Sequence, residues 1–242
     1  KFEPKFSQRG IPMVIFFHGG PEGQFRPRFM GRYNYLMSEE RIALLCPNVR
    51  GSRGYGKRHL KADNGMDRAR VMLDVQRLRN AVSADSYFDA DRIAVMGGSY
   101  GGFMTLHSMV VLNNFVKCGV DVVGISNFVT FLKNTSDYRR DLRRVEYGDE
   151  RDPKMRKFLQ ELSPLTHVNE ITRPLLIVQG ANDPRVPVSE SEQMEQALRK
   201  NGIETWYLLA KDEGHGFRKQ ANREFQFLTT IQFLRKHLLD KE

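Results

Sequence analysis

The chain has 242 residues, of which 40% are hydrophobic and 28% charged, as expected for one globular domain with a full core. No apolar run approaches the roughly 20 residues that span a bilayer, and no N-terminal stretch has the order of a signal peptide. The formal net charge is +9, but Lys and Arg are scattered along the chain, so neither nucleic acid nor a membrane is an expected partner.

Six short apolar runs, rich in β-branched residues, alternate with helical patterns along the chain. They are Met13–Phe17, Ile42–Pro47, Arg92–Met96, Val120–Ile125, Pro174–Gln179 and Thr205–Leu209. Near-continuous apolar runs are typical of strands buried on both faces. Residues 72–82 and 228–238 place apolar side chains three or four apart, as on one face of a helix, and the segment after Ser99 is apolar nearly all round. The alternation predicts an α/β fold with a mostly parallel, doubly wound sheet and helices on both faces.

The stretch from Phe128 to Val168 breaks this alternation, because it separates two predicted strands by about forty residues where a few are usual. It predicts a helical excursion over the end of the sheet where ligands bind in this architecture. Within it, arginines alternate with acidic residues, which indicates a salt-bridged helix face; docking of another domain or of an acidic substrate stays open. The residues are Arg139, Arg140, Arg143, Arg144, Asp137, Asp141 and Glu146.

The strand predicted at Arg92–Met96 runs into Gly97-Gly98-Ser99-Tyr100-Gly101, a G-x-S-x-G sequence followed by an apolar helix. In this strand–turn–helix context the motif forms a nucleophile elbow. Side chains two residues either side of the serine would collide with the adjoining strand and helix, which explains the glycines at 97 and 101. Ser99 is therefore the predicted nucleophile, and a serine that only caps the helix is the alternative.

A nucleophilic serine needs a histidine base and a carboxylate that orients the histidine. Asp183 follows the fifth predicted strand and His215 follows the sixth, which is the chain order of α/β-hydrolases. Each alone is also typical of a plain loop, but with Ser99 they predict a catalytic triad. Two rival carboxylates lie too close to His215 in sequence to contact the side of its ring opposite Ser99. Four other histidines are interpreted as structural or exposed. These residues are Asp212, Glu213, His59, His107, His167 and His237.

Two backbone N–H donors must stabilise the oxyanion of such a site. One is expected from Tyr100, the residue after the nucleophile. The other is expected from the loop His18-Gly19-Gly20-Pro21, with the Gly20 N–H favoured over that of Gly19; a plain Gly-Pro turn is the alternative. No metal or cofactor is implied, because no cluster of His, Cys and Asp has ligand spacing.

Cys46 and Cys118 are too few for a disulfide framework and are expected to be reduced, buried thiols. Reduced thiols favour a cytoplasmic location. The chain begins at Lys1 rather than Met, so we expect that a leader or a whole domain precedes it.

Five segments together resemble the prolyl oligopeptidase family, in particular its acylaminoacyl-peptidase-like and dipeptidyl-aminopeptidase-like branch. They are His-Gly-Gly-Pro at 18–21, Arg-Gly-Ser-Arg-Gly-Tyr-Gly at 50–56, Gly-Gly-Ser-Tyr-Gly-Gly at 97–102, Asn-Asp-Pro-Arg-Val-Pro at 182–187 and Glu-Gly-His-Gly-Phe at 213–217. The resemblance implies an α/β-hydrolase domain that cleaves short peptides through an acyl-enzyme. It also implies that Arg185 binds a substrate carbonyl, which a guanidinium does by charge-assisted hydrogen bonds. An exposed arginine paired with a nearby acid is the alternative for Arg185.

The chain also departs from the family's pattern. Members carry a large N-terminal β-propeller that restricts access to short peptides, and nothing like it, nor the fold's usual first two strands, is found in this sequence. We therefore predict that residues 1–242 form a single catalytic domain whose propeller is absent from this chain. A serine peptidase is the predicted function, and a small-ester or thioester hydrolase on the same fold is the alternative. The scissile-residue preference and the oligomeric state stay open.

Overall fold

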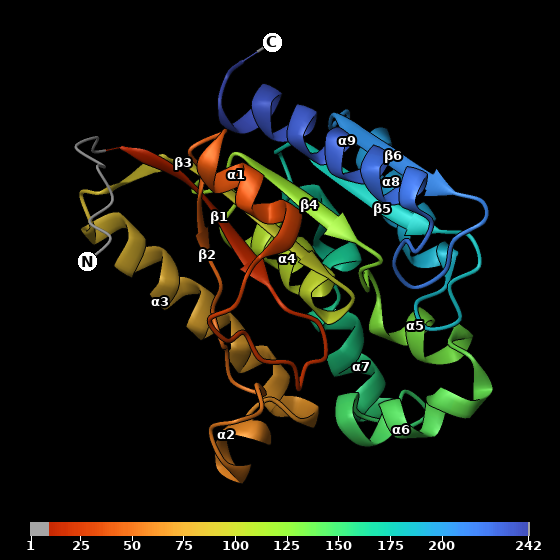
Figure 1. Cartoon of the computed structure of the whole chain (residues 1–242). Coiled ribbons are helices and arrows are strands. Elements are labelled where there is room, and N and C mark those ends of the chain that lie inside the picture. Colours follow the sequence, from red (N-terminus) through yellow and green to blue (C-terminus); the bar gives the residue numbers. More distant parts are fainter. Residues whose placement is uncertain (1–9, 242) are drawn as a thin grey trace.

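The computed structural model describes residues 10–241, in which six strands form one sheet in the order β2-β1-β3-β4-β5-β6 (Figure 1). The strands are β1 (Ile11–Phe17), β2 (Ala43–Leu45), β3 (Phe88–Gly98), β4 (Cys118–Val122), β5 (Leu175–Gly180) and β6 (Thr205–Ala210). Every neighbouring pair is parallel. The predicted parallel, doubly wound sheet is therefore confirmed.

Helices cover both faces of the sheet. The α-helices are α1 (Asn34–Ser38), α2 (Lys57–Leu60), α3 (Val71–Ala84), α4 (Tyr100–Val111), α5 (Phe128–Asn134), α6 (Asp137–Tyr147), α7 (Pro153–Leu162), α8 (Val188–Lys200) and α9 (Gln220–Leu238). Single 3₁₀ segments lie at Gly31–Tyr33, Gly65–Arg70 and Pro164–Glu170.

Successive side chains of each strand point to opposite faces of the sheet, so the core is divided into two layers. In β1, Met13 and Ile15 pack with α3 and α4 on one face, whereas Val14 packs with α1 and α9 on the other. Figure 1 shows α9 and α1 on the opposite side of the sheet from α3 and α4. Because each fully buried aliphatic side chain contributes about 1.5–3 kcal/mol, these two layers supply most of the energy that holds the sheet.

The strand ends differ from the predicted ones where the backbone leaves the extended conformation. The predicted run Val120–Ile125 ends as a strand at Val122, because Val123 has a φ of 48°. The predicted run Ile42–Pro47 pairs only over Ala43–Leu45, since β2 is an edge strand and a proline cannot donate to the ladder.

The predicted excursion at 128–168 is confirmed and consists of α5, α6, α7 and the following 3₁₀ segment (Figure 1). Its first helix is fixed at its N-terminus, where the Asn127 side chain accepts hydrogen bonds from Val129 N and Thr130 N. The Glu190 carboxylate, on α8, accepts further bonds from Ser126 N and Asn127 N. These contacts tie the excursion to the domain beside the end of β4.

Both cysteines are unpaired; Cys118 is buried and Cys46 is half-buried. Within residues 10–241, the helices are too short or too polar to cross a bilayer.

Candidate active site

Ser99 is the single residue between β3 and α4, at a sharp turn of the chain. Its φ of 60° and ψ of −117° place a non-glycine residue in a strained region of the backbone map. Two bonds hold it there: Ser99 N donates to Val122 O at 2.9 Å, and Ser99 O accepts from Gly102 N at 2.9 Å. The strain lifts the serine out of both the strand and the helix, as an elbow requires.

The glycines of the elbow are required by close backbone contacts. A Cβ atom at Gly97 would collide with the carbonyl group of Gly101, and one at Gly101 would collide with the carbonyl oxygen of Phe17. The turn therefore brings β1, β3 and α4 too close together for any side chain at these two positions.

Asp183 and His215 lie on the loops after β5 and β6 and contact each other directly. His215 Nδ1 lies 2.7 Å from Asp183 Oδ2. The second carboxylate oxygen accepts from Arg185 N at 2.8 Å and Val186 N at 3.0 Å, so the turn itself fixes the orientation of the carboxylate. A carboxylate at Nδ1 assigns the proton to that atom, which leaves Nε2 as the proton acceptor.

A pocket of about 290 Å³ brings most of the predicted site residues together. Ser99, Gly20, Arg185 and His215 all line it, whereas Asp183 is buried behind His215. The other lining residues are Gly19, Ile125, Phe131, Arg139, Arg143, Tyr147 and Val186. Within residues 10–241 the Ser99 hydroxyl forms no hydrogen bond; in unliganded sites the bond from nucleophile to base is often long and tightens only with substrate.

The oxyanion-hole candidates differ in how they reach the pocket. Gly20 has a φ of 139°, and a Cβ there would collide with the backbone N atoms of Glu22 and Gly23, so only glycine fits the loop. Tyr100 does not line the pocket: its side chain is buried, and its hydroxyl donates to Asp63. The backbone N–H of Tyr100 belongs to the first turn of α4, whose N–H groups have no partner within the helix.

His18, at the start of the oxyanion loop, has a positioning contact that sequence reasoning did not find. Its Nε2 lies 2.8 Å from Ser52 Oγ, and the Ser52 hydroxyl donates to Val49 O. This contact, together with that of His18 Nδ1 with Gly19 O at 2.8 Å, fixes the start of the glycine loop against the segment after β2.

The rejected candidates lie outside the pocket. Asp212 is exposed and pairs with Lys219, whereas Glu213 accepts from Arg218 N and Lys219 N. The four histidines interpreted as structural or exposed have other partners. His59 contacts Val49 O and His107 contacts Leu162 O. His167 contacts Glu161 O and Glu170, and His237 contacts Glu204.

The excursion supplies pocket residues that the sequence did not single out as lining. Phe131, Arg139, Arg143 and Tyr147 come from α5 and α6, and Ile125 comes from the loop before α5. The sequence predicted that the excursion lies over the ligand-binding end of the sheet, but not which helix faces form the pocket wall.

A parallel sheet with a serine elbow at its centre, and an Asp–His pair on loops after later strands, defines an α/β-hydrolase domain. The chain belongs to the prolyl oligopeptidase family, which matches residues 27–241, so the predicted resemblance is confirmed.

Comparisons with single proteins agree with this assignment. The chain is 38% identical over 223 residues to dipeptidyl aminopeptidase BIII of Pseudoxanthomonas mexicana, covering 90% of this chain and 32% of that protein. It is 37% identical over 214 residues to dipeptidyl peptidase family member 6 of Caenorhabditis elegans, covering 87% and 29%. A puromycin-hydrolyzing peptidase of Mycobacterium tuberculosis superposes with a TM-score of 0.84 and 28% identity, over 96% of this chain and 35% of that one. The chain thus spans about a third of the length of these relatives.

Proposed function

We propose that the chain is the catalytic domain of a serine peptidase that cleaves short peptides, in the manner of dipeptidyl or acylaminoacyl peptidases. The observation that carries the proposal is the Asp183–His215 hydrogen bond beside a pocket that both His215 and the strained Ser99 line. The names of the relatives, a dipeptidyl aminopeptidase and a dipeptidyl peptidase family member, support a peptide substrate.

In the proposed mechanism, His215 Nε2 takes the proton of the Ser99 hydroxyl as the serine oxygen attacks the scissile carbonyl. The N–H groups of Tyr100 and Gly20 stabilise the resulting oxyanion. His215 then gives its proton to the leaving amine, which departs, and water hydrolyses the acyl-enzyme by the same route. Asp183 stays ionised and keeps the imidazole in the required tautomer.

Arg185 is proposed to hold a second carbonyl of the peptide. Its side chain is exposed at the pocket, and within residues 10–241 no carboxylate lies at ion-pair distance from its guanidinium. The guanidinium donors are therefore available to a substrate, which favours this role over that of a surface ion pair.

The ester-hydrolase alternative rests on the shared fold alone, and the relatives give it no support. Because the chain spans about a third of its relatives' length, we propose that the full protein has a further domain, the predicted propeller, which limits access to short peptides. A cytoplasmic location stays a prediction.

Labelling with a fluorophosphonate probe tests the proposal. The chain and a Ser83→Ala control, in which an exposed serine is changed, should be labelled equally, and Ser99→Ala should not be labelled. Labelling should accompany turnover of dipeptidyl or N-acyl-aminoacyl anilides. Turnover of p-nitrophenyl esters alone would favour the ester-hydrolase alternative, and failure to label a folded chain would contradict the triad.

A further inference from the structure

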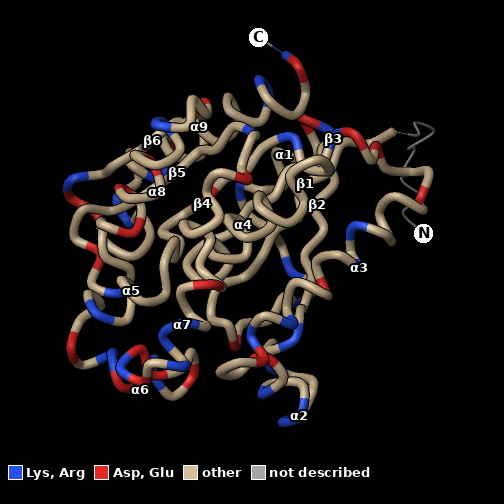
Figure 2. Tube along the Cα trace, turned by 180° about the vertical axis from the view of Figure 1, so that it is seen from behind, with Lys and Arg blue, Asp and Glu red and all other residues tan. Residues whose placement is uncertain are grey.

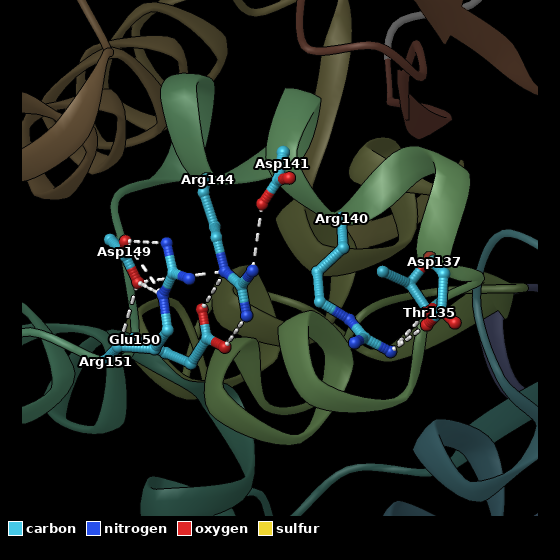
Figure 3. Close-up of polar contacts among 8 residues, drawn as sticks. All are labelled: Thr135, Asp137, Arg140, Asp141, Arg144, Asp149, Glu150 and Arg151. Atoms are coloured by element: carbon cyan, nitrogen blue, oxygen red, sulfur yellow. Dashed lines mark hydrogen bonds and ion pairs between the residues drawn. The ribbon is translucent and has the colours of Figure 1, made fainter.

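Helix α6 carries two pairs of arginines, each pair four residues apart, and one pair is neutralised by carboxylates (Figure 3). Arg140 lies 2.7 Å from Asp137 Oδ1. Arg144 forms ion pairs of 2.9 Å with Asp141 and 2.6 Å with Glu150. Figure 3 shows both guanidinium groups directed at these carboxylates. This pair therefore has little charge left for a ligand.

The other pair, Arg139 and Arg143, lies one position earlier and so about 100° round the helix. Both residues line the pocket that Ser99 and His215 also line. Arg143 donates to Glu146 Oε2 at 2.5 Å. The predicted ion pairs of this helix are thus confirmed for three of its four arginines.

Arg139 differs from the other three. Within residues 10–241 no carboxylate lies at ion-pair distance from it, and its guanidinium lies 5.9 Å from the ring centroid of Tyr138. Figure 2 shows Lys and Arg spread over many elements, with blue and red interleaved on α6. The net charge of the chain alone therefore does not explain why Arg139 lacks an acidic partner at the pocket.

The pocket keeps an excess of positive charge even though Arg143 is paired with Glu146. Three guanidinium groups line it, those of Arg139, Arg143 and Arg185, and its described lining includes no Asp or Glu. Four of its other lining residues are apolar or aromatic, and of these the side chains of Phe131 and Tyr147 are buried. At about 290 Å³ it admits a short stretch of extended peptide rather than a folded partner.

We infer that this pocket binds a carboxylate of the peptide substrate, with Arg139 and Arg143 as its ligands. The inference rests on the proposed function, because it concerns the substrate of the same site. A planar guanidinium matches a carboxylate with two parallel hydrogen bonds. An apolar or amide side chain would instead desolvate Arg139 without supplying the charge partner that it lacks, which costs free energy. The carboxylate comes either from an Asp or Glu side chain or from the C-terminus of a very short peptide.

Binding to the Ser99→Ala variant separates these two sources without requiring turnover. The probes are the peptides Ala-Glu-Ala-amide and Ala-Gln-Ala-amide, and Ala-Ala-Ala with a free or an amidated C-terminus, titrated by calorimetry at pH 7. A side-chain carboxylate predicts that the Glu peptide binds about tenfold more tightly than the Gln peptide, as one charge-assisted interaction allows. A C-terminal carboxylate predicts the same ratio between free and amidated Ala-Ala-Ala. Equal binding within both pairs would overturn the inference.

Variants of α6 test whether the arginines are responsible. Arg139→Gln and Arg143→Gln, each made in the Ser99→Ala chain, should reduce the carboxylate preference to about twofold or less, whereas Arg140→Gln on the neutralised face should keep it. Denaturation midpoints show whether each variant is folded. A preference that survives in both Arg139→Gln and Arg143→Gln would also overturn the inference.

The two proposals fail in different experiments. Loss of fluorophosphonate labelling would contradict the serine peptidase, but it leaves the binding ratios of the Ser99→Ala chain unaffected. If a chain that labels normally turns over Glu and Gln anilides with equal kcat/KM, and free and amidated Ala-Ala-Ala bind equally to Ser99→Ala, the peptidase proposal holds and the carboxylate pocket does not.

Discussion

Arg68 and Asp63 form an ion pair of 2.8 Å in which both side chains have 0% of their surface exposed. The guanidinium carbon of Arg68 lies 5.1 Å from the ring centroid of Tyr100 and 4.5 Å from that of Tyr147. The Tyr100 hydroxyl donates to the same carboxylate oxygen of Asp63 at 3.2 Å. Tyr147 lines the pocket and Tyr100 begins the helix after the nucleophile, so this buried pair supports one pocket wall and the start of that helix.

Removing Arg68 alone should be strongly destabilising. Burial raises the pKa of the Asp63 carboxyl, and the Arg68 charge opposes that rise. In Arg68→Met the carboxylate loses the cation with which it is paired, so we expect a cost of about 3–5 kcal/mol in the free energy of unfolding. The double variant Arg68→Met/Asp63→Leu should be less destabilised than Arg68→Met, because no buried charge is left unpaired. Urea denaturation measures both, and a single variant within about 1 kcal/mol of the parent chain would show that the pair is not needed.

The Asp183 carboxylate should be essential for rate but not for folding. In Asp183→Asn an amide oxygen can still accept from Arg185 N and Val186 N, but the side chain no longer fixes the proton on His215 Nδ1. The wrong tautomer should lower kcat by about 10⁴. The matched control is Asp212→Asn, which changes an exposed carboxylate on the same loop as His215 and should alter kcat less than about twofold. Similar losses in both variants would contradict the assignment of Asp183 as the acid.

The sheet and the order of the site residues could be predicted from sequence because local patterns determine both. Apolar runs mark strands, and the glycines at 97 and 101 mark a turn that tolerates no side chain. Similarly, Asp183 and His215 could be placed because each follows a predicted strand.

Which arginines of α6 face the pocket could not be predicted, because it depends on how the helix is turned against the sheet. Tyr147 is buried, which sets the helix rotation and directs Arg139 and Arg143 at the pocket. The chain then turns at Gly148, whose φ is 110°, and returns Glu150 to Arg144. The sequence therefore suggested that acidic residues on the helix itself pair with its arginines, but not that Glu150, on the loop after the helix, does so. Nor could it reveal the Asp63–Arg68 pair, since charged residues five apart in a polar stretch are ordinarily exposed.

Two neighbouring glycines of the elbow should differ sharply in their tolerance of alanine. A Cβ at Gly97 would collide with the carbonyl group of Gly101, whereas the nearest atoms to a Cβ at Gly98 are Val122 O at 3.6 Å and Val122 Cβ at 3.9 Å. Gly97→Ala should therefore destabilise the chain by about 1–3 kcal/mol and reduce fluorophosphonate labelling, because the elbow must shift. Gly98→Ala makes only ordinary contacts and should stay close to the parent chain. If the two variants have equal denaturation midpoints and labelling rates, then the elbow is less tightly packed than the structure indicates.

Asp121 should make the stability of the chain depend on pH. Its side chain is buried on β4 with Oδ1 unpartnered within the described residues, and burial raises the pKa of its carboxyl from 3.8 to about 8, opposed by a backbone hydrogen bond from Gly124. Between these values the folded chain binds a proton that the unfolded chain has lost, so the contribution of Asp121 to stability falls as pH rises from about 4 to about 8. The slope for one proton is at most ~1.4 kcal/mol per pH unit.

The variant Asp121→Asn removes this titration and should flatten the dependence of unfolding free energy on pH across that window. Relative to the parent chain, its stability should therefore improve steadily from pH 5 to pH 8. Asp91→Asn, which changes an exposed carboxylate on β3, is the matched control and should leave the slope of the parent chain in place. Urea midpoints at four pH values measure all three chains. Parallel curves for Asp121→Asn and the parent chain would mean that Asp121 is already ionised at pH 5 in the folded state, which its burial on β4 opposes.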